Sequence, residues 1–176
     1  NKGIDTLLEA CALIDREPGR PIVLFLMVPA ANSGVCKSLL DRLRAPLESL
    51  KTPLDLSTHN LIEREGDPIQ QLAQRLGLKN ASESRVAVIQ IPVYLNGNDG
   101  LLNLPYEAAL RAMDLSVFPS FYEPWGYTPE ESLAVGVPTV TTDHAGFGRW
   151  ARAVGLGPAD GVTVLERVGV NDQVAA

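Results

Sequence analysis

The chain has few cysteines, few aromatic residues and no long apolar run. Two of its 176 residues are cysteines, and aromatic residues make up 6%. The longest apolar stretch, Ile22–Pro29, is the length of a strand and far short of the ~20 residues that a membrane-spanning helix needs. These absences argue against a disulfide-stapled scaffold and against a membrane protein. We therefore expect an ordinary globular protein with a hydrophobic core.

Positive charge is also scarce. The net charge is −6 and the sequence has no basic stretch, which argues against nucleic acid or an anionic membrane surface as a partner. Any anionic ligand must therefore meet positive charge that is placed locally. Cys11 and Cys36 lie in helical patterns, so we expect free thiols in a reducing, cytoplasmic compartment rather than a disulfide.

Strand-like and helix-like segments alternate along the whole sequence. This alternation predicts an α/β fold with a Rossmann-like, mainly parallel sheet and helices on both faces. Residues 51–67 are predicted to be an ordered surface loop, and residues 171–176 the start of a helix. The sequence begins without Met, and we interpret it as a single domain cut from a longer protein. The predicted strands cover 22–28, 86–91, 115–119, 139–142 and 161–165, and the predicted helices cover 3–14, Ser33 to about Leu50, 68–76, 104–113, and Thr128 to the residue before Gly136.

The segment after the strand at 115–119 is the best candidate for a site. Ligands of open parallel sheets bind beyond the carboxyl ends of the strands. Thr128 suits the N-cap of the following helix, and Pro129 suits its first position. The first amides of that helix and its dipole would then favour a phosphate group, and Gly126 would let the backbone approach it closely.

Two carboxylates frame this segment. Glu123 precedes a proline, which holds its backbone extended, and a carboxylate there can accept hydrogen bonds from sugar hydroxyls. Its alternative is a solvated loop glutamate. Glu131 lies three residues after Thr128, so it can instead complete a capping box. Glu130 is expected to face solvent, while Trp125 and Tyr127 could be core aromatics, pocket walls or both.

These residues carry a resemblance to a known family. Tyr122–Glu131 is similar to the animal and fungal glycogen synthase motif Y-E-P-W-G-Y-T-P-A-E, and only Glu130 differs from it. The resemblance covers nearly the whole chain in order. It extends to Asn1–Asp5, which resembles the element N-K-G-x-D, and to Thr58–Leu61, Asp67–Ile69, Leu115–Ser120, Gly136–Pro138 and Gly146–Gly148.

The resemblance implies the C-terminal, donor-binding half of a two-domain GT-B glucosyltransferase that retains configuration. The donor would be UDP-glucose or ADP-glucose, and an α-glucan acceptor would bind to a missing N-terminal domain. No cofactor or bound metal is implied. The sequence itself has no D-x-D pair and no His/Cys cluster.

The resemblance also assigns roles to single residues. Glu123 is expected to bind glucose hydroxyls and is the one catalytic candidate, while Glu131 binds the ribose. Lys2 corresponds to a lysine that contacts the diphosphate, although sequence alone favours a solvated lysine there. Tyr106 corresponds to a tyrosine that stacks on the base. The donor-binding candidates are completed by Trp125, Gly126, Tyr127 and Thr128.

Some family features are absent or altered. The strand before Asn1 is expected to carry an arginine that neutralises the leaving diphosphate, and the Arg-rich helix that senses a sugar phosphate is not in this sequence. Asp143-His144-Ala145 replaces the usual N-L-S. His144, beside Gly146, could line the pocket, but we expect it to be a surface loop residue.

Two other functions are weighed beside this one. Gly146–Ala151 fits the dinucleotide fingerprint G-x-G-x-x-[GA], with Glu166 twenty residues after Gly146, which would indicate an NAD(P)-dependent oxidoreductase. Such a fingerprint normally opens its domain, and here only 25 residues follow it. A non-catalytic module that only binds a sugar nucleotide is the third hypothesis.

Overall fold

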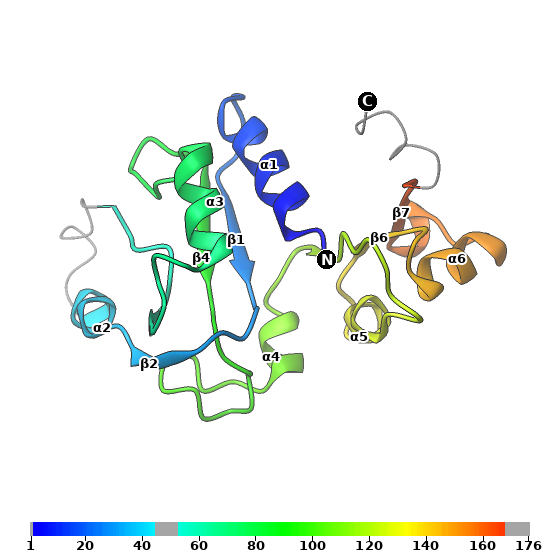
Figure 1. Ribbon diagram of the computed structural model, residues 1–176. Helices are drawn as coiled ribbons and strands as arrows, with labels where there is room; N and C mark the ends of the chain where they lie inside the picture. Colours follow the sequence, from blue (N-terminus) through cyan, green and yellow to red (C-terminus); the bar gives the residue numbers. More distant parts are fainter. Residues whose placement is uncertain (1, 45–52, 168–176) are drawn as a thin grey trace. The chain divides into compact units, whose positions relative to one another are not determined.

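The computed structural model describes residues 2–44 and 53–167 (Figure 1). The chain divides into two compact units, and each is described by itself. The N-terminal unit is Leu7–Leu104, and the C-terminal unit combines Asn1–Thr6 with Pro105–Ala176. The residues of helix α1 (Ile4–Asp15) are divided between the units: those up to Thr6 belong to the C-terminal unit and those from Leu7 on to the N-terminal unit. No helix among the described residues is long and apolar enough to cross a membrane.

The N-terminal unit contains a parallel pair of strands. β1 (Ile22–Leu26) pairs with β4 (Val86–Gln90), and an antiparallel pair is formed by β2 (Asn32–Val35) and β3 (His59–Leu61). Its other helices are α2 (Lys37–Arg44) and α3 (Pro68–Leu76). Cys11 and Cys36 are both buried free thiols, as the sequence predicted.

Helix α3 shows how the sequence sets the ends of a helix. The Asp67 carboxylate accepts hydrogen bonds from the amides of Ile69 and Gln70, each at 3.0 Å. Pro68 occupies the first helical position, where its missing N–H costs nothing. Gly77 ends the helix in the left-handed conformation, with φ 79°. This helix was predicted with the same bounds.

The C-terminal unit contains three parallel strands in the order β5 (Ser116–Val117), β6 (Thr139–Thr142) and β7 (Val162–Leu165). Its helices are α4 (Tyr106–Leu110), α5 (Tyr127–Ala134) and α6 (Gly146–Ala153), and a short 3-10 helix, η2 (Pro158–Asp160), precedes β7. Helix α5 contacts β5 and β6, and α6 contacts β6 and β7. The predicted Rossmann-like α/β fold with parallel strands is confirmed.

Three local predictions were wrong. Ser33 does not cap a helix but lies in β2, because the Asn32 side chain holds this segment extended through bonds to the carbonyls of Ala30 and Pro92 and from the amide of Gly34. The predicted loop at 51–67 contains β3, and the Thr58 carbonyl just before β3 accepts a hydrogen bond from the Cys36 amide just after β2. The helix predicted at 104–113 is only Tyr106–Leu110, since the extended Pro105 is its N-cap. The far end of the helix predicted to Leu50 and the helix predicted at 171–176 lie outside the described residues.

The core of the C-terminal unit lies under α6. Phe147, Ala151 and Val162 are buried, and Trp125 and Leu133 are among the partly buried side chains that pack against them. Burial of this apolar surface is the main term that stabilises the unit.

Strand β6 buries two hydroxyl groups, those of Thr139 and Thr141, with no hydrogen-bond partner. A buried hydroxyl without a partner costs about 1–3 kcal/mol, whereas an apolar group of the same shape costs nothing of this kind. Thr139→Val is therefore expected to raise the free energy of unfolding by about 1–2 kcal/mol. The measurement is thermal or chemical unfolding of the full-length protein.

Thr142→Val is the matched control on the same strand. The Thr142 hydroxyl donates a hydrogen bond of 2.7 Å to the Ser120 carbonyl, so its loss should lower stability. A Thr139→Val protein that is less stable than wild type would contradict the argument.

Candidate functional site

The predicted site segment follows β5 in the C-terminal unit, and the backbone of Glu123 is fixed there. The Glu123 amide donates to the His144 carbonyl at 3.4 Å, and its carbonyl accepts from the Gly146 amide at 3.1 Å. Glu123 and Ala145 thereby form a parallel bridge. Two residues further on, the Trp125 carbonyl accepts a 2.7 Å bond from the Phe147 amide. The turn between β6 and α6 thus holds the whole segment from Glu123 to Trp125.

Gly146 makes this close approach possible. A Cβ atom at this position would lie 2.2 Å from the Pro124 carbonyl oxygen and 2.9 Å from Cα of Trp125. The first amides of α6 then donate to carbonyls of the site segment. In a dinucleotide fold the corresponding amides face a pyrophosphate. Here the amides of Gly146 and Phe147 already donate to backbone carbonyls of Glu123 and Trp125, so they are not available to a pyrophosphate. This argues against the oxidoreductase interpretation of Gly146–Ala151.

Lys2 meets Glu123 although 121 residues separate them in sequence. The Lys2 ammonium group donates to the Glu123 carboxylate and forms an ion pair with it. The residue after Lys2, Gly3, lies against Pro119 so closely that a Cβ atom would be 1.8 Å from the Pro119 carbonyl oxygen. Glu123 is therefore not a solvated loop glutamate, and two of the predicted site residues lie together.

Helix α5 begins two residues earlier than its capping residues suggested. Its N-cap is Gly126, which has the left-handed conformation with φ 89° and ψ 79°. Thr128 was predicted as the N-cap but is the second helical residue, so the capping box with Glu131 does not form. The reason is that Gly126 alone in this segment reaches positive φ without strain, which lets the helix start at Tyr127. The start of α5 has no side-chain cap.

Tyr106 and Glu131, two further predicted residues, lie on helices that contact each other, α4 and α5. Tyr106 is half-buried at the start of α4, which contacts α5. Burial raises the pKa of the Tyr106 phenol, and the carboxylates of Glu131 and Glu107 raise it further. The Glu131 side chain is exposed, so it is free of a capping role and open to a ligand.

Trp125 packs as a core aromatic. Its ring meets Phe147 edge-on, with centroids 6.2 Å apart and planes at 81°, and Trp150 lies at 6.2 Å. Its indole N–H donates a 3.0 Å hydrogen bond to Glu130, so Glu130 is more than a solvent-facing acid. Tyr127 and Thr128 are exposed at the start of α5. Trp125 thus packs in the core of the unit, while Tyr127 and Thr128 face solvent.

Sequence reasoning missed a set of contacts around Phe121. The Arg167 guanidinium lies over the Phe121 ring, 3.9 Å from its centroid, and the Arg167 amide donates to Asp143 at 2.7 Å. His144 was predicted to be a surface residue, but it is half-buried and its Nδ1 forms a 2.8 Å hydrogen bond with the Phe121 carbonyl. The departure from N-L-S at Asp143–Ala145 was the signal that could have drawn attention to these contacts.

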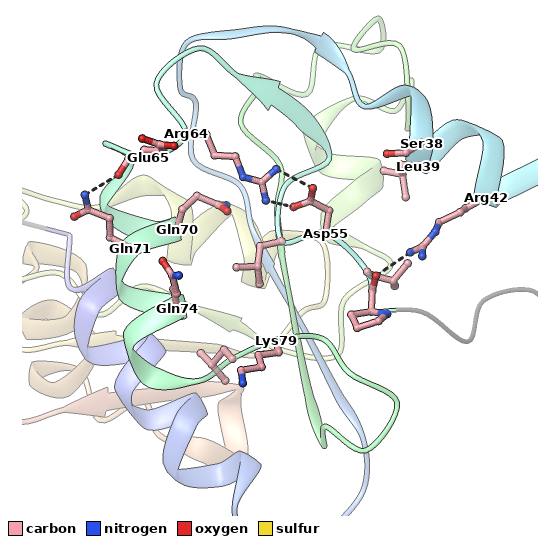
Figure 2. A pocket seen from close by; sticks show the side chains of 14 residues that line it. Ser38, Leu39, Arg42, Asp55, Arg64, Glu65, Gln70, Gln71, Gln74 and Lys79 are labelled. Atoms are coloured by element: carbon pink, nitrogen blue, oxygen red, sulfur yellow. Dashed lines mark hydrogen bonds and ion pairs between the residues drawn. The ribbon is translucent and has the colours of Figure 1, made fainter.

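The N-terminal unit has a polar cleft of about 740 Å³ between α2, α3 and the segment that follows Pro53 (Figure 2). The N–H groups of both terminal nitrogens of Arg64 donate hydrogen bonds to the two carboxylate oxygens of Asp55. Burial raises the pKa of Asp55, but the bonds from Arg64 and from the amides of Ser57 and Leu56 outweigh it and leave the pKa below its ordinary value. Arg64 in turn has a raised pKa because it donates to Asp55. Within the described chain, no three His, Cys, Asp or Glu residues are grouped to hold a metal ion.

This ion pair gives a pH-dependent prediction. The lowered pKa of Asp55 means that the pair stabilises the fold above the unfolded pKa of about 3.9, and that this contribution is lost as pH falls through the folded pKa. Arg64→Gln is expected to lower the free energy of unfolding by about 0.2–1 kcal/mol above pH 5. The deficit should shrink toward zero below pH 4 in unfolding experiments at several pH values. A deficit that stays constant down to pH 2 would contradict this account.

The fold and the site together define a parallel α/β domain with a charged site at the carboxyl end of β5. Comparison with known proteins gives the family: residues 38–173 match the family model described as glycogen synthase. The chain belongs to the glycogen synthase family.

Proteins with similar sequences are named glycogen (starch) synthases. Isoform 1 of the glycogen (starch) synthase of Saccharomyces cerevisiae is 46% identical over 130 residues, which are 74% of this chain. The liver glycogen (starch) synthase of Homo sapiens is 42% identical over 113 residues, or 64% of this chain, and the Caenorhabditis elegans protein is 42% identical over 123 residues, or 70%. The chain spans only 16–18% of the length of these relatives.

Proposed function

We propose that this chain is the sugar-nucleotide-binding domain of a cytoplasmic, retaining glucosyltransferase that extends an α-1,4-glucan. The donor is UDP-glucose or ADP-glucose, and the glucan acceptor binds elsewhere in the full-length protein. Membership of the glycogen synthase family supports the reaction class. The observation that carries the proposal is the ion pair of Lys2 and Glu123 beside the uncapped start of α5.

Each group has a separate role in this proposal. Lys2 and the first amides of α5 meet the diphosphate, because a helix N-terminus and an ammonium group both favour negative charge. Glu123 orients the glucose through its hydroxyl groups, with its backbone held by the β6–α6 turn. Glu131 accepts hydrogen bonds from the ribose, and the nearby Tyr106 stacks on the base.

Rate acceleration in this site is electrostatic. Negative charge grows on the departing nucleotide in the transition state, and positive groups fixed in advance stabilise it without reorganisation. Lys2 and the α5 amides supply that charge from this chain. No side chain is assigned as a covalent nucleophile. The reaction needs no cofactor, since the activated sugar already carries its leaving group.

Thermal shift of the full-length protein with UDP, ADP and NAD, and with UDP-glucose and ADP-glucose, tests the binding. A ligand at 100 times its Kd adds about 2.7 kcal/mol to the stability of the folded state. We expect a uridine or adenine sugar nucleotide to stabilise the protein and NAD to have no effect. Stabilisation by NAD alone would overturn the proposal. Glucosyl transfer from the donor to glycogen then separates an active enzyme from a module that only binds.

A further inference from the structure

We propose that the Lys2–Glu123 ion pair makes the site discriminate against the free nucleoside diphosphate and in favour of the nucleotide sugar, so that it promotes release of the spent nucleotide. This inference rests on the proposed function, because it takes Lys2 as a diphosphate ligand and Glu123 as a glucose ligand. It adds that the two groups depend on each other, because a ligand that binds the Lys2 ammonium group also breaks the Lys2–Glu123 ion pair.

The two partners are held together by their backbones. On the Lys2 side, the next residue, Gly3, packs so closely against the Pro119 carbonyl that a Cβ atom would not fit. Both peptide groups of Glu123 are bonded to the β6–α6 turn. The pair is therefore present before a ligand arrives. The Lys2 side chain is 65% exposed and that of Glu123 is 27% exposed, so a ligand can reach the ammonium group from solvent.

The balance of charge then differs between the two ligands. A nucleotide sugar takes the Lys2 ammonium with its diphosphate and offers glucose hydroxyls to the Glu123 carboxylate, so both partners are satisfied again. A free nucleoside diphosphate takes Lys2 but offers Glu123 nothing. It leaves a carboxylate without its cation, close to a ligand of the same charge. Exposed ion pairs are worth little, so this penalty corresponds to about a two- to fivefold weaker affinity for the diphosphate.

The same pair acts after glucose has been transferred. Once the hexose has left, Glu123 has lost its hydroxyl partners and competes with the diphosphate for Lys2. Recapture of the ammonium group weakens the hold on the nucleotide. Glu123 thus selects for the donor by two routes: it binds the sugar, and it withholds Lys2 from the product.

Opposite effects of one substitution test this inference. In the full-length protein, Glu123→Gln removes the charge that holds Lys2 but keeps the size of the side chain. Titration calorimetry is expected to show UDP or ADP binding two- to fivefold more tightly, while the matching nucleotide glucose binds about tenfold more weakly or worse. Glu130→Gln is the matched control: it removes a charge from the same helix start and keeps an oxygen to accept the Trp125 N–H, so it should leave the ratio of the two affinities near that of wild type.

A double-mutant cycle shows whether Lys2 carries the effect. In a Lys2→Met background, Glu123→Gln should no longer tighten UDP or ADP binding. The inference is overturned if Glu123→Gln leaves diphosphate affinity unchanged or weaker, or if Glu130→Gln tightens it equally. If wild type binds the nucleotide glucose in the same experiments, the proposed function stands even when this inference fails. Failure of wild type to bind any sugar nucleotide would overturn both.

Discussion

Replacement of Glu123 by glutamine in the full-length protein is expected to lower kcat/KM for the nucleotide sugar by about ten- to 150-fold. The estimate follows from the loss of charge-assisted hydrogen bonds to glucose hydroxyls, worth about 1.5–3 kcal/mol. The backbone of Glu123 is bonded through its own amide and carbonyl, so the variant side chain keeps its position. Steady-state kinetics of glucosyl transfer to glycogen provide the measurement.

Glu130→Gln separates this effect from a general loss of charge. Glu130 lies seven residues further on and bonds to the indole N–H of Trp125 rather than to Lys2. Its glutamine variant should transfer glucose at nearly the wild-type rate. Wild-type kinetics in the Glu123→Gln protein, or an equal loss in both variants, would remove Glu123 from the site.

Gly146→Ala is expected to be strongly destabilising. The added Cβ would lie 2.2 Å from the Pro124 carbonyl oxygen, and neither backbone segment can give way without breaking the bonds that join them. Overpacking of this kind costs about 1–3 kcal/mol and occasionally more. We expect a lower Tm of the full-length protein together with a loss of donor affinity, since the same contact positions Glu123.

Gly157→Ala is the control for this substitution. A Cβ atom at Gly157 would meet nothing within 4 Å, and the residue has an ordinary extended backbone with φ −146°. Its alanine variant should unfold at nearly the wild-type temperature. Equal Tm values for the two alanine variants would show that the packing of α6 on the site segment tolerates an added methyl group.

Local sequence rules predicted the elements well where no other residues compete. The continuous apolar run that begins at Ile22 predicted β1, and Pro68, which suits a first helical turn, predicted the start of α3 at the correct residue. These rules failed where contacts with residues distant in sequence determine the secondary structure. Ser33 has the right chemistry for a helix cap, but pairing of β2 with β3 and the bonds of Asn32 hold it in a strand.

The candidate site shows the same division. The position of Glu123 after a strand and before a helix could be predicted from alternation and from Pro124, and the resemblance supplied its expected role. The ion pair with Lys2 could not be predicted from the residues alone, because the two residues are 121 positions apart in sequence and meet only in the folded chain. The start of α5 was misjudged because capping preferences favour Thr128, whereas the backbone freedom of Gly126 decided the outcome.

The bonds between the Glu123–Trp125 segment and the start of α6 have a consequence for cooperativity. The amides of Gly146 and Phe147 donate to carbonyls of this segment, so displacing the segment breaks hydrogen bonds of the first turn of α6, and fraying of that turn breaks hydrogen bonds of the segment. Local opening of the two is therefore coupled. A ligand that grips the segment would accordingly protect the amides of α6 against hydrogen exchange, although it need not touch that helix.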